Sequence, residues 1–120
     1  MSNINFFESN DVPQPRDKIK IERVESQPYP DGWRVKVTIE VTPFQERPSL
    51  EIRVRSGQRI VSELSVIETM HRLMEFTVHV RGVPSPAGQY VTEVDLYYED
   101  RTKIQDHRDF AFAISIGENP

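Results

Sequence analysis

The 120-residue sequence contains no cysteine. This absence excludes disulfides, thiolate zinc sites and a cysteine nucleophile. The chain also has no apolar run approaching the roughly 18 residues of a membrane span, and its first residues lack the basic and apolar segments of a signal peptide. We therefore expect a cytoplasmic protein that does not insert into membranes. A secreted chain trimmed of its leader would have the same sequence.

An excess of positive charge is also missing. The chain has 15 Lys and Arg against 19 Asp and Glu, which gives a net charge of −4. Neutralising phosphates requires a basic surface, so we expect no general nucleic-acid binding. The length fits one domain, and a hydrophobic fraction of 37% is high enough for a folded core.

The hydrophobic pattern has a period of two along most of the chain. From Trp33 to Thr42 every odd position is apolar and every even position is polar, and the same alternation returns over 50–55, 74–81 and 110–116. Such alternation is typical of strands that bury one face. Nine prolines and five glycines gather mostly between these runs, at the roughly ten-residue spacing of turns in a β-sandwich or barrel.

We therefore predict an all-β fold, a seven-stranded antiparallel sandwich with Greek-key connections. Val24 is out of phase with Ile19 and Ile21, which indicates a bulge in the first strand. A short helix near 66–73 is the alternative for part of the chain, because Ile67, Met70 and similar residues there also fit helical spacing. The strands are expected near 17–25, 33–42, 49–56, 59–67, 73–81, 89–99 and 106–116.

The first 16 residues differ from the rest, being rich in Ser, Asn and Pro. We expect a flexible or loosely docked segment over 1–16 and the sandwich domain over 17–117. Phe6 and Phe7 are the exception in this segment. They are expected to pack along the edge of the domain, and a hook for a partner is the alternative.

One motif gives the fold a family resemblance. Gly88-Gln89-Tyr90 opens the sixth expected strand after a Pro-rich loop, and immunoglobulin-like domains place a tyrosine there whose hydroxyl bonds upstream backbone. Over residues 17–117 the chain resembles the immunoglobulin-like and fibronectin type III-like sandwiches. The resemblance implies a corner role for Tyr90, places Thr92 where antibody domains carry a cysteine, and suits Trp33 as a core residue of the second strand. It implies no functional residues.

The resemblance also implies that the third and sixth strands are neighbours. Arg53 and Arg55 would then face outward beside Glu93 and Asp95. Opposite charges across strands stabilise their pairing by a few tenths to about 1 kcal/mol each. A solvated face is as good an interpretation of these residues as a binding surface.

Metal sites are not expected. His71 and His79 are eight residues apart, roughly 26 Å along a strand, and His107 lies in a polar link. A calcium site would need six to eight oxygens, and the interleaved Arg101, Lys103 and Arg108 favour ion pairing instead. The carboxylates that such a site would use are Glu99, Asp100, Asp106 and Asp109.

Catalysis is not expected either. The sequence has no Gly-x-Ser-x-Gly elbow, phosphate loop or His-Glu-x-x-His. We predict no enzyme, no cofactor and no catalytic residues, and the sequence assigns no binding residues. The expected function is a protein-interaction module that binds another protein or itself through loops or an edge strand.

A carbohydrate or small-ligand binding module, or an accessory module of an enzyme, is the alternative. It would need exposed aromatic side chains, and the candidates are Tyr29, Phe44 and Tyr97. If the second and fifth strands pair, a basic stripe is a further candidate surface, although a mixed solvated face also explains its residues. The stripe would consist of Arg34, Lys36, His79 and Arg81.

Overall fold

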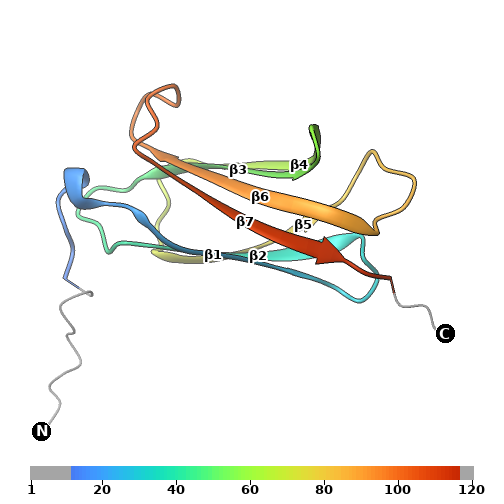
Figure 1. The fold of residues 1–120 in the computed structure, drawn as a ribbon. Helices are drawn as coiled ribbons and strands as arrows, with labels where there is room; N and C mark the ends of the chain where they lie inside the picture. The colour runs from blue at the N-terminus through green and yellow to red at the C-terminus, as the bar shows by residue number, and fades with distance from the viewer. Residues whose placement is uncertain (1–11, 117–120) are drawn as a thin grey trace, which may run out of the picture.

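The computed structural model describes residues 12–116 of the chain. One turn of 3-10 helix, Arg16–Lys18, precedes seven strands (Figure 1). None of the helical residues described is part of a segment long and apolar enough to cross a membrane. The strands are β1 (Ile21–Pro28), β2 (Arg34–Val41), β3 (Ser49–Ser56), β4 (Arg59–Val66), β5 (Leu73–His79), β6 (Gly88–Tyr97) and β7 (Asp106–Ile114).

The strands form two antiparallel sheets that pack face to face. One sheet has the order β1-β2-β5 and the other has the order β4-β3-β6-β7. The chain crosses between the sheets after β2, after β4 and after β5 (Figure 1). The β-sandwich prediction is therefore confirmed. Because β4 pairs with β3 and not with the first sheet, the order differs from that of antibody constant domains.

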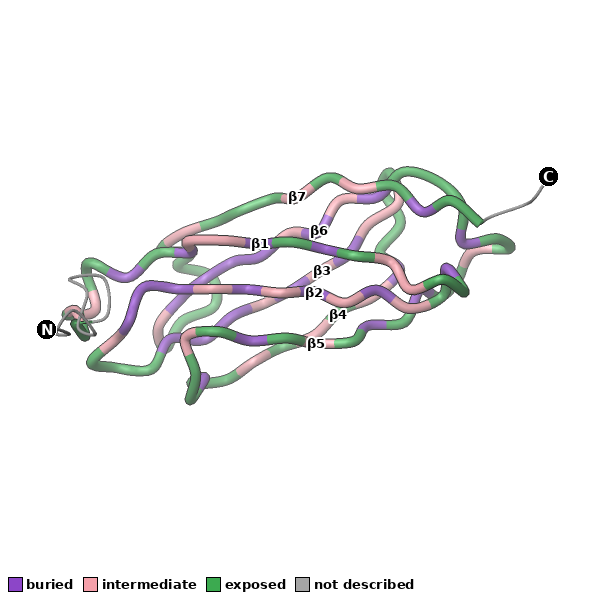
Figure 2. The backbone as a smooth tube through the Cα atoms, turned by 90° about the horizontal axis from the view of Figure 1, so that it is seen from below, coloured by how far each residue is buried: buried purple, intermediate pink, exposed green. Residues whose placement is uncertain are grey.

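The core follows the alternation in the sequence. In β2 the inward side chains Val35, Val37 and Ile39 are completely buried, and their even-numbered neighbours are half-buried on the outer face. Figure 2 shows the same change of burial from residue to residue along the strands. The opposite sheet contributes residues such as Leu50 and Leu96 to this core, so one period-two pattern in each sheet supplies the interior.

Six of the seven strands lie within two residues of their predicted limits, and the first does not. We expected it to begin at residue 17, but Arg16–Lys18 form a helical turn in which the Lys18 N–H donates to the Pro15 carbonyl at 2.9 Å. The predicted bulge is confirmed, because the register of β1 against β2 shifts between Ile21 and Arg23.

The helix considered near 66–73 is wrong. Residues 67–72 form an irregular connection between β4 and β5. Its backbone is bonded to a neighbouring segment instead of to itself: the Glu68 N–H donates to Ser49 Oγ and the Thr69 N–H donates to the Pro48 carbonyl, each at 2.9 Å. These contacts use the donors that a helix would need.

The expectation that Trp33 is a core residue is also wrong. Trp33 precedes β2 and is 39% exposed. Its carbonyl accepts the Val80 N–H at 2.8 Å, at the very end of the β2–β5 ladder. The adjacent Gly32 lies against Pro86, which is buried and closes this end of the sandwich. The tryptophan position is therefore at the border of the core.

One side of the sandwich is closed by side chains. β1 and β7 belong to different sheets but run side by side (Figure 2). At the bulge, Asp106 Oδ2 accepts the N–H of Ile21 at 2.7 Å, and Arg108 donates to the Ile21 carbonyl at 2.9 Å. Two side chains of β7 thus bond the backbone of β1 where its ladder is interrupted.

Part of the N-terminal segment contacts the domain. Gln14 forms a bridge with Phe44, in which the Gln14 N–H donates to Pro43 and the Gln45 N–H donates to Gln14, each at 2.9 Å. Phe6 and Phe7 lie outside the described residues. The division of the chain at residue 16 stays a prediction.

Candidate functional site

The outer face of the four-stranded sheet carries the predicted charge ladder. β3 pairs with β6 so that Arg53 is opposite Glu93. Arg53 donates to Glu93 at 3.1 Å and to Asp95 at 2.9 Å, and Arg55 donates to Glu93 at 2.6 Å. The cross-strand pairing expected from the sequence is confirmed. These carboxylates are used to hold neighbouring strands together.

His107 extends this ladder onto β7. Its Nδ1 lies 2.5 Å from Asp95 Oδ1, and its Nε2 lies 2.5 Å from Asp109 Oδ1. The hydrogen bond to Asp95 raises the pKa of His107, against the effect of burial. Burial works to raise the pKa of Asp95, but the bonds from His107 and Arg53 outweigh it and lower that pKa. The cluster therefore favours a charged imidazolium between two carboxylates.

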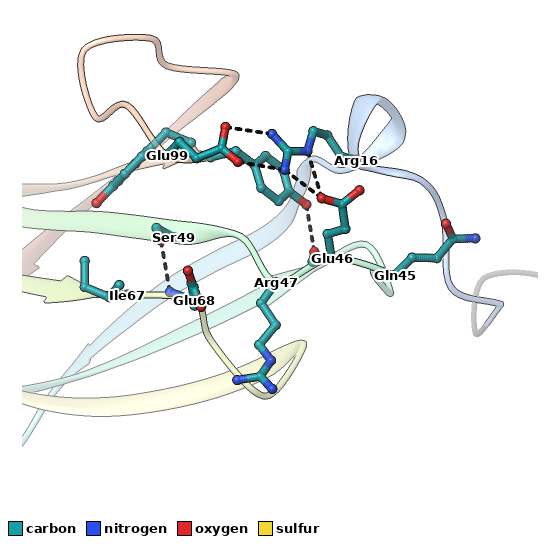
Figure 3. A pocket seen from close by; sticks show the side chains of 10 residues that line it. Arg16, Gln45, Glu46, Arg47, Ser49, Ile67, Glu68 and Glu99 are labelled. Carbon is teal, nitrogen blue, oxygen red and sulfur yellow. Dashed lines mark hydrogen bonds and ion pairs between the residues drawn. The ribbon is translucent and has the colours of Figure 1, made fainter.

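A groove of about 520 Å³ lies at the end of the sandwich where the chain enters it. Arg16 lies across one side of this groove (Figure 3). Its guanidinium is 4.5 Å from the centre of the Tyr98 ring and bonds Glu46 at 2.6 Å and Glu99 at 3.0 Å. Three segments distant in sequence therefore meet at one arginine.

The same cluster fixes its aromatic residue. The Tyr98 hydroxyl donates to the Glu46 carbonyl at 3.0 Å, and burial raises the pKa of Tyr98 to about 12. Gln105 donates to the carbonyls of Arg16 and Ile19 at 2.8 and 2.7 Å. This side of the groove is thus held in place by hydrogen bonds among the N-terminal segment and two loops.

The other side of the groove comes from the β4–β5 connection. Ile67 and Glu68 line it, together with Ser49 at the start of β3 and Arg47 just before β3 (Figure 3).

Two residues of the groove have unusual backbone. Glu68 has φ of 49° and Glu99 has φ of 50°, and among residues 12–116 no other non-glycine residue has positive φ. Both line the groove. Left-handed backbone costs a non-glycine residue roughly 1–2 kcal/mol and often occurs at functional sites.

Ile67, an exposed apolar side chain, lines this groove, and two more exposed apolar side chains follow it in the chain. Ile67 is 66% exposed, Met70 is 70% exposed and Leu73 is 52% exposed. All three belong to the 67–72 connection or to the first residue of β5, and we call them the 67–73 rim. Leu73 borders a different depression, on the outer face of the three-stranded sheet, so the rim extends from the groove toward that face.

The histidines do not form a metal site. His71 is exposed in the β4–β5 connection, His79 is exposed at the end of β5, and His107 is held by Asp95 and Asp109. Within residues 12–116 no three histidine or carboxylate side chains are grouped so that they could bind an ion.

The four carboxylates considered for calcium go to different partners. Glu99 bonds Arg16, and Asp100 accepts from the backbone and hydroxyl of Thr102 at 2.9 and 2.6 Å. Asp106 accepts a hydrogen bond from the Ile21 N–H of β1, and Asp109 lies against His107. The structure does not bring these groups together around one point.

The outer face of the three-stranded sheet holds part of the predicted basic stripe. Arg34 is opposite His79 and Lys36 is opposite Thr77 in the β2–β5 ladder, so three members of the stripe share this face. Arg81 leaves it, because its N–H turns to the Val61 carbonyl of β4 at 3.1 Å.

The aromatic candidates for ligand binding are mostly covered. Tyr97 is 5% exposed, and Phe44 is half-buried against the core. The expectation that these two side chains are exposed is therefore wrong. Tyr29 is half-buried on the outer face of the three-stranded sheet, and the Arg34 guanidinium lies 4.5 Å from its ring centre. One aromatic side chain with adjacent cations is what remains of this candidate surface.

Sequence comparison gives no relative, since no family model and no curated protein matches the chain. Comparison of folds does. A glycosyl hydrolase family 2 (GH2) member from Bacteroides cellulosilyticus DSM 14838 matches with a TM-score of 0.56 and 16% identity, over 80% of this chain and 15% of that chain. The β-glucuronidase of Ruminococcus gnavus matches with a TM-score of 0.45 and 14% identity, over 81% of this chain and 16% of that one.

The likeness is one of fold. The chain spans 15% of the length of the first hydrolase, so the match concerns one sandwich domain within a much longer protein. It agrees with the all-β sandwich predicted from the strand pattern.

Proposed function

We propose that this protein is a non-catalytic interaction module that binds another protein through the 67–73 rim and the adjacent groove. The exposure of Ile67, Met70 and Leu73 carries the proposal. Methionine and aliphatic side chains form adaptable contacts, and the charged residues of the groove would supply the polar border that protein interfaces commonly have. Hydrogen bonds and ion pairs around Arg16 hold the opposite side of the groove in place before binding.

The protonation of the carboxyl groups favours binding over acid catalysis. A catalytic acid at neutral pH needs a raised pKa. Over residues 12–116, every carboxyl group with a shifted pKa has it lowered, and those groups are Asp31, Glu93, Asp95, Glu99 and Asp100. Hydrogen bonds and ion pairs from arginine and histidine, from backbone and, for Asp100, from the Thr102 hydroxyl cause this lowering, which suits structural contacts.

The likeness to a small part of a glycosyl hydrolase also supports an accessory role. In that protein a sandwich of this fold is one part of a longer enzyme chain. By analogy, the partner of the 67–73 rim would be a larger protein, and a carbohydrate-active enzyme is the first class to test.

The test compares the proteins that the purified wild-type chain retains with those that two matched variants retain. Met70→Glu places a charge in the rim, and Ile60→Glu places one on an apolar residue of β4 that is 45% exposed and lies away from the rim. We expect Met70→Glu to lose the proteins retained by the wild type and Ile60→Glu to keep them. Equal retention by both variants would contradict the proposal, and so would a wild type that retains nothing.

A sugar-binding accessory module is the second candidate, favoured by the surface around Tyr29. Arg34 stacks on this ring and is paired with Asp31 at 2.9 Å, and Lys36 lies nearby on the same face with no ion pair in the described part of the chain. A ring with adjacent cations would suit an acidic sugar. Titration with a panel of neutral and acidic glycans, repeated with Tyr29→Ala, tests it, and absence of any binding would exclude this candidate.

A further inference from the structure

Along the outer edge of β5, alternate residues have backbone groups with no hydrogen-bond partner among the described residues. The Val80 N–H donates to the carbonyl of Trp33, the residue just before β2, and the Val41 N–H donates to the Arg72 carbonyl. Since bonding alternates along an antiparallel strand, the even-numbered residues of β5 direct their backbone N–H and C=O groups toward β2. The odd-numbered residues, Glu75 and Thr77 among them, direct their N–H and C=O groups away from the sheet. The next odd residue confirms this direction, because the Arg81 N–H points away from β2 and bonds β4.

The other three edge strands are protected, each in its own way. β1 has a bulge at Ile21–Arg23 whose backbone is bonded by two side chains of β7, and β7 itself lies against β1. β4 has a register shift opposite Val54 and Arg55, and its Val61 carbonyl is already occupied by Arg81. Bulges and covered edges prevent strand addition.

Within Leu73–His79 the edge of β5 has no bulge and no backbone bond on its outer side to any described residue, although β4 approaches this edge and bonds Arg81 just beyond it. Its seven residues pair with β2 without a register shift, and the strand contains no proline, glycine or lysine. Glu75 is its single acidic residue. A regular, unprotected edge is a template for another strand.

We propose that two copies of this chain associate through β5, edge to edge and antiparallel, with a two-fold axis at Thr77. The two three-stranded sheets would then form one continuous six-stranded sheet. This register pairs Thr77 with Thr77 of the second copy, and it pairs Phe76 with Val78 of the second copy twice. Hydroxyl pairs and aromatic–aliphatic pairs are favourable across strands.

Avoidance of facing carboxylates selects the same register. With the axis at Thr77, Glu75 of each copy is opposite His79 of the other, and both side chains are exposed on the outer face. With the axis at Glu75, two carboxylates would be directly opposite each other, which destabilises a pair of strands. The edge is therefore complementary to itself in the first arrangement, which is why we assign it to a second copy and not to an unrelated strand.

Proline at residue 77 gives the sharpest test, because the Thr77 N–H faces away from β2. Proline is tolerated on edge strands where its missing N–H faces solvent. Thr77→Pro should leave the fold intact and abolish the dimer, whereas Thr77→Val, which keeps the N–H, should remain dimeric. Analytical ultracentrifugation over a wide concentration range measures both, and circular dichroism checks the fold. A wild type that stays monomeric overturns the proposal, and so does a Thr77→Pro dimer.

A charge exchange tests the register and does not depend on proline. Glu75→Lys should raise the dimer dissociation constant roughly tenfold, since the change occurs at two symmetric pairs. The double variant Glu75→Lys and His79→Glu places opposite charges in both pairs and should recover the affinity. If it does not, the register is wrong. Met70→Glu should leave this dimer unchanged, so failure of the rim and failure of the β5 edge give separate results.

Discussion

The hydroxyl of Tyr90 donates a 2.6 Å hydrogen bond to the carbonyl oxygen of Pro86. Tyr90 is 3% exposed, and its ring stacks on Phe112 of β7 with the centroids 5.5 Å apart. This bond joins the loop between β5 and β6 to the start of β6. It is the corner that the Gly88-Gln89-Tyr90 motif predicts, and it fixes the same end of the sandwich that Pro86 closes.

Tyr90→Phe should lower the free energy of unfolding by about 1–3 kcal/mol, because the Pro86 carbonyl would lose a buried partner. Urea denaturation followed by circular dichroism measures the change. Tyr29→Phe is the control, since the Tyr29 hydroxyl makes an exposed 3.3 Å contact with Thr77 and its removal should have little effect. Equal effects of the two variants would show that the corner bond does not stabilise the fold.

A second buried bond links the two sheets. Ser26 Oγ of β1 lies 2.6 Å from Thr92 Oγ1 of β6, and both residues are buried. Thr92→Val alone should cost about 1–3 kcal/mol because it leaves the Ser26 hydroxyl without its partner. Adding Ser26→Ala should recover much of this loss. A double-mutant cycle measures the coupling, and additive losses would contradict it.

His107 should make stability depend on pH. Its hydrogen bond to Asp95 raises the pKa of His107 above the ordinary value of 6.5. The charged form is therefore stabilised by folding, and this contribution is full below pH 6.5 and is lost as the pH rises through the folded-state pKa. His107→Gln should be more destabilising in acid than in alkali, by less than about 1 kcal/mol because the imidazole is partly exposed.

Urea midpoints of wild type and His107→Gln across this pH range test the prediction. A difference that grows with pH for His107→Gln would have the wrong sign.

Because the backbone of Glu68 is left-handed, glycine and valine should have opposite effects on stability there and at a strand position. Glu68→Gly should be neutral or raise the free energy of unfolding by up to about 1 kcal/mol, and Glu68→Val should lower it by at least about 1 kcal/mol. At Glu63, an exposed strand position, glycine should destabilise and valine should not. Thermal denaturation of the four variants checks the pattern, and the same order at both sites would contradict it.

The alternating residues predict most of the fold because sandwich strands bury one face. In β2 each inward residue is also apolar in sequence, so strand limits and core follow directly. Trp33 shows where this reasoning fails. Trp33 is odd-numbered, like the inward residues of β2, but the alternation does not show where a sheet ends. Trp33 lies just before the first paired residue of β2.

The groove could not be predicted from the sequence for a related reason. Arg16, Glu46 and Glu99 share no spacing, and they meet because three loops end at the same border of the sandwich. In contrast, the pairing of Arg53 and Arg55 with Glu93 follows once β3 and β6 are neighbours. Charges on strands are placed by register, whereas charges on loops are placed by the finished tertiary structure.

The closure between β1 and β7 has a consequence for the order of folding. Ile21 receives its bonds from residues 85 and 87 positions later in the chain. Contacts of such long sequence separation form slowly, because most of the chain must be ordered before they can be made. During synthesis the bulge of β1 stays uncovered until β7 has left the ribosome. Closure of this side should therefore be among the last steps of folding, and slowing it would expose β1 to other nascent chains.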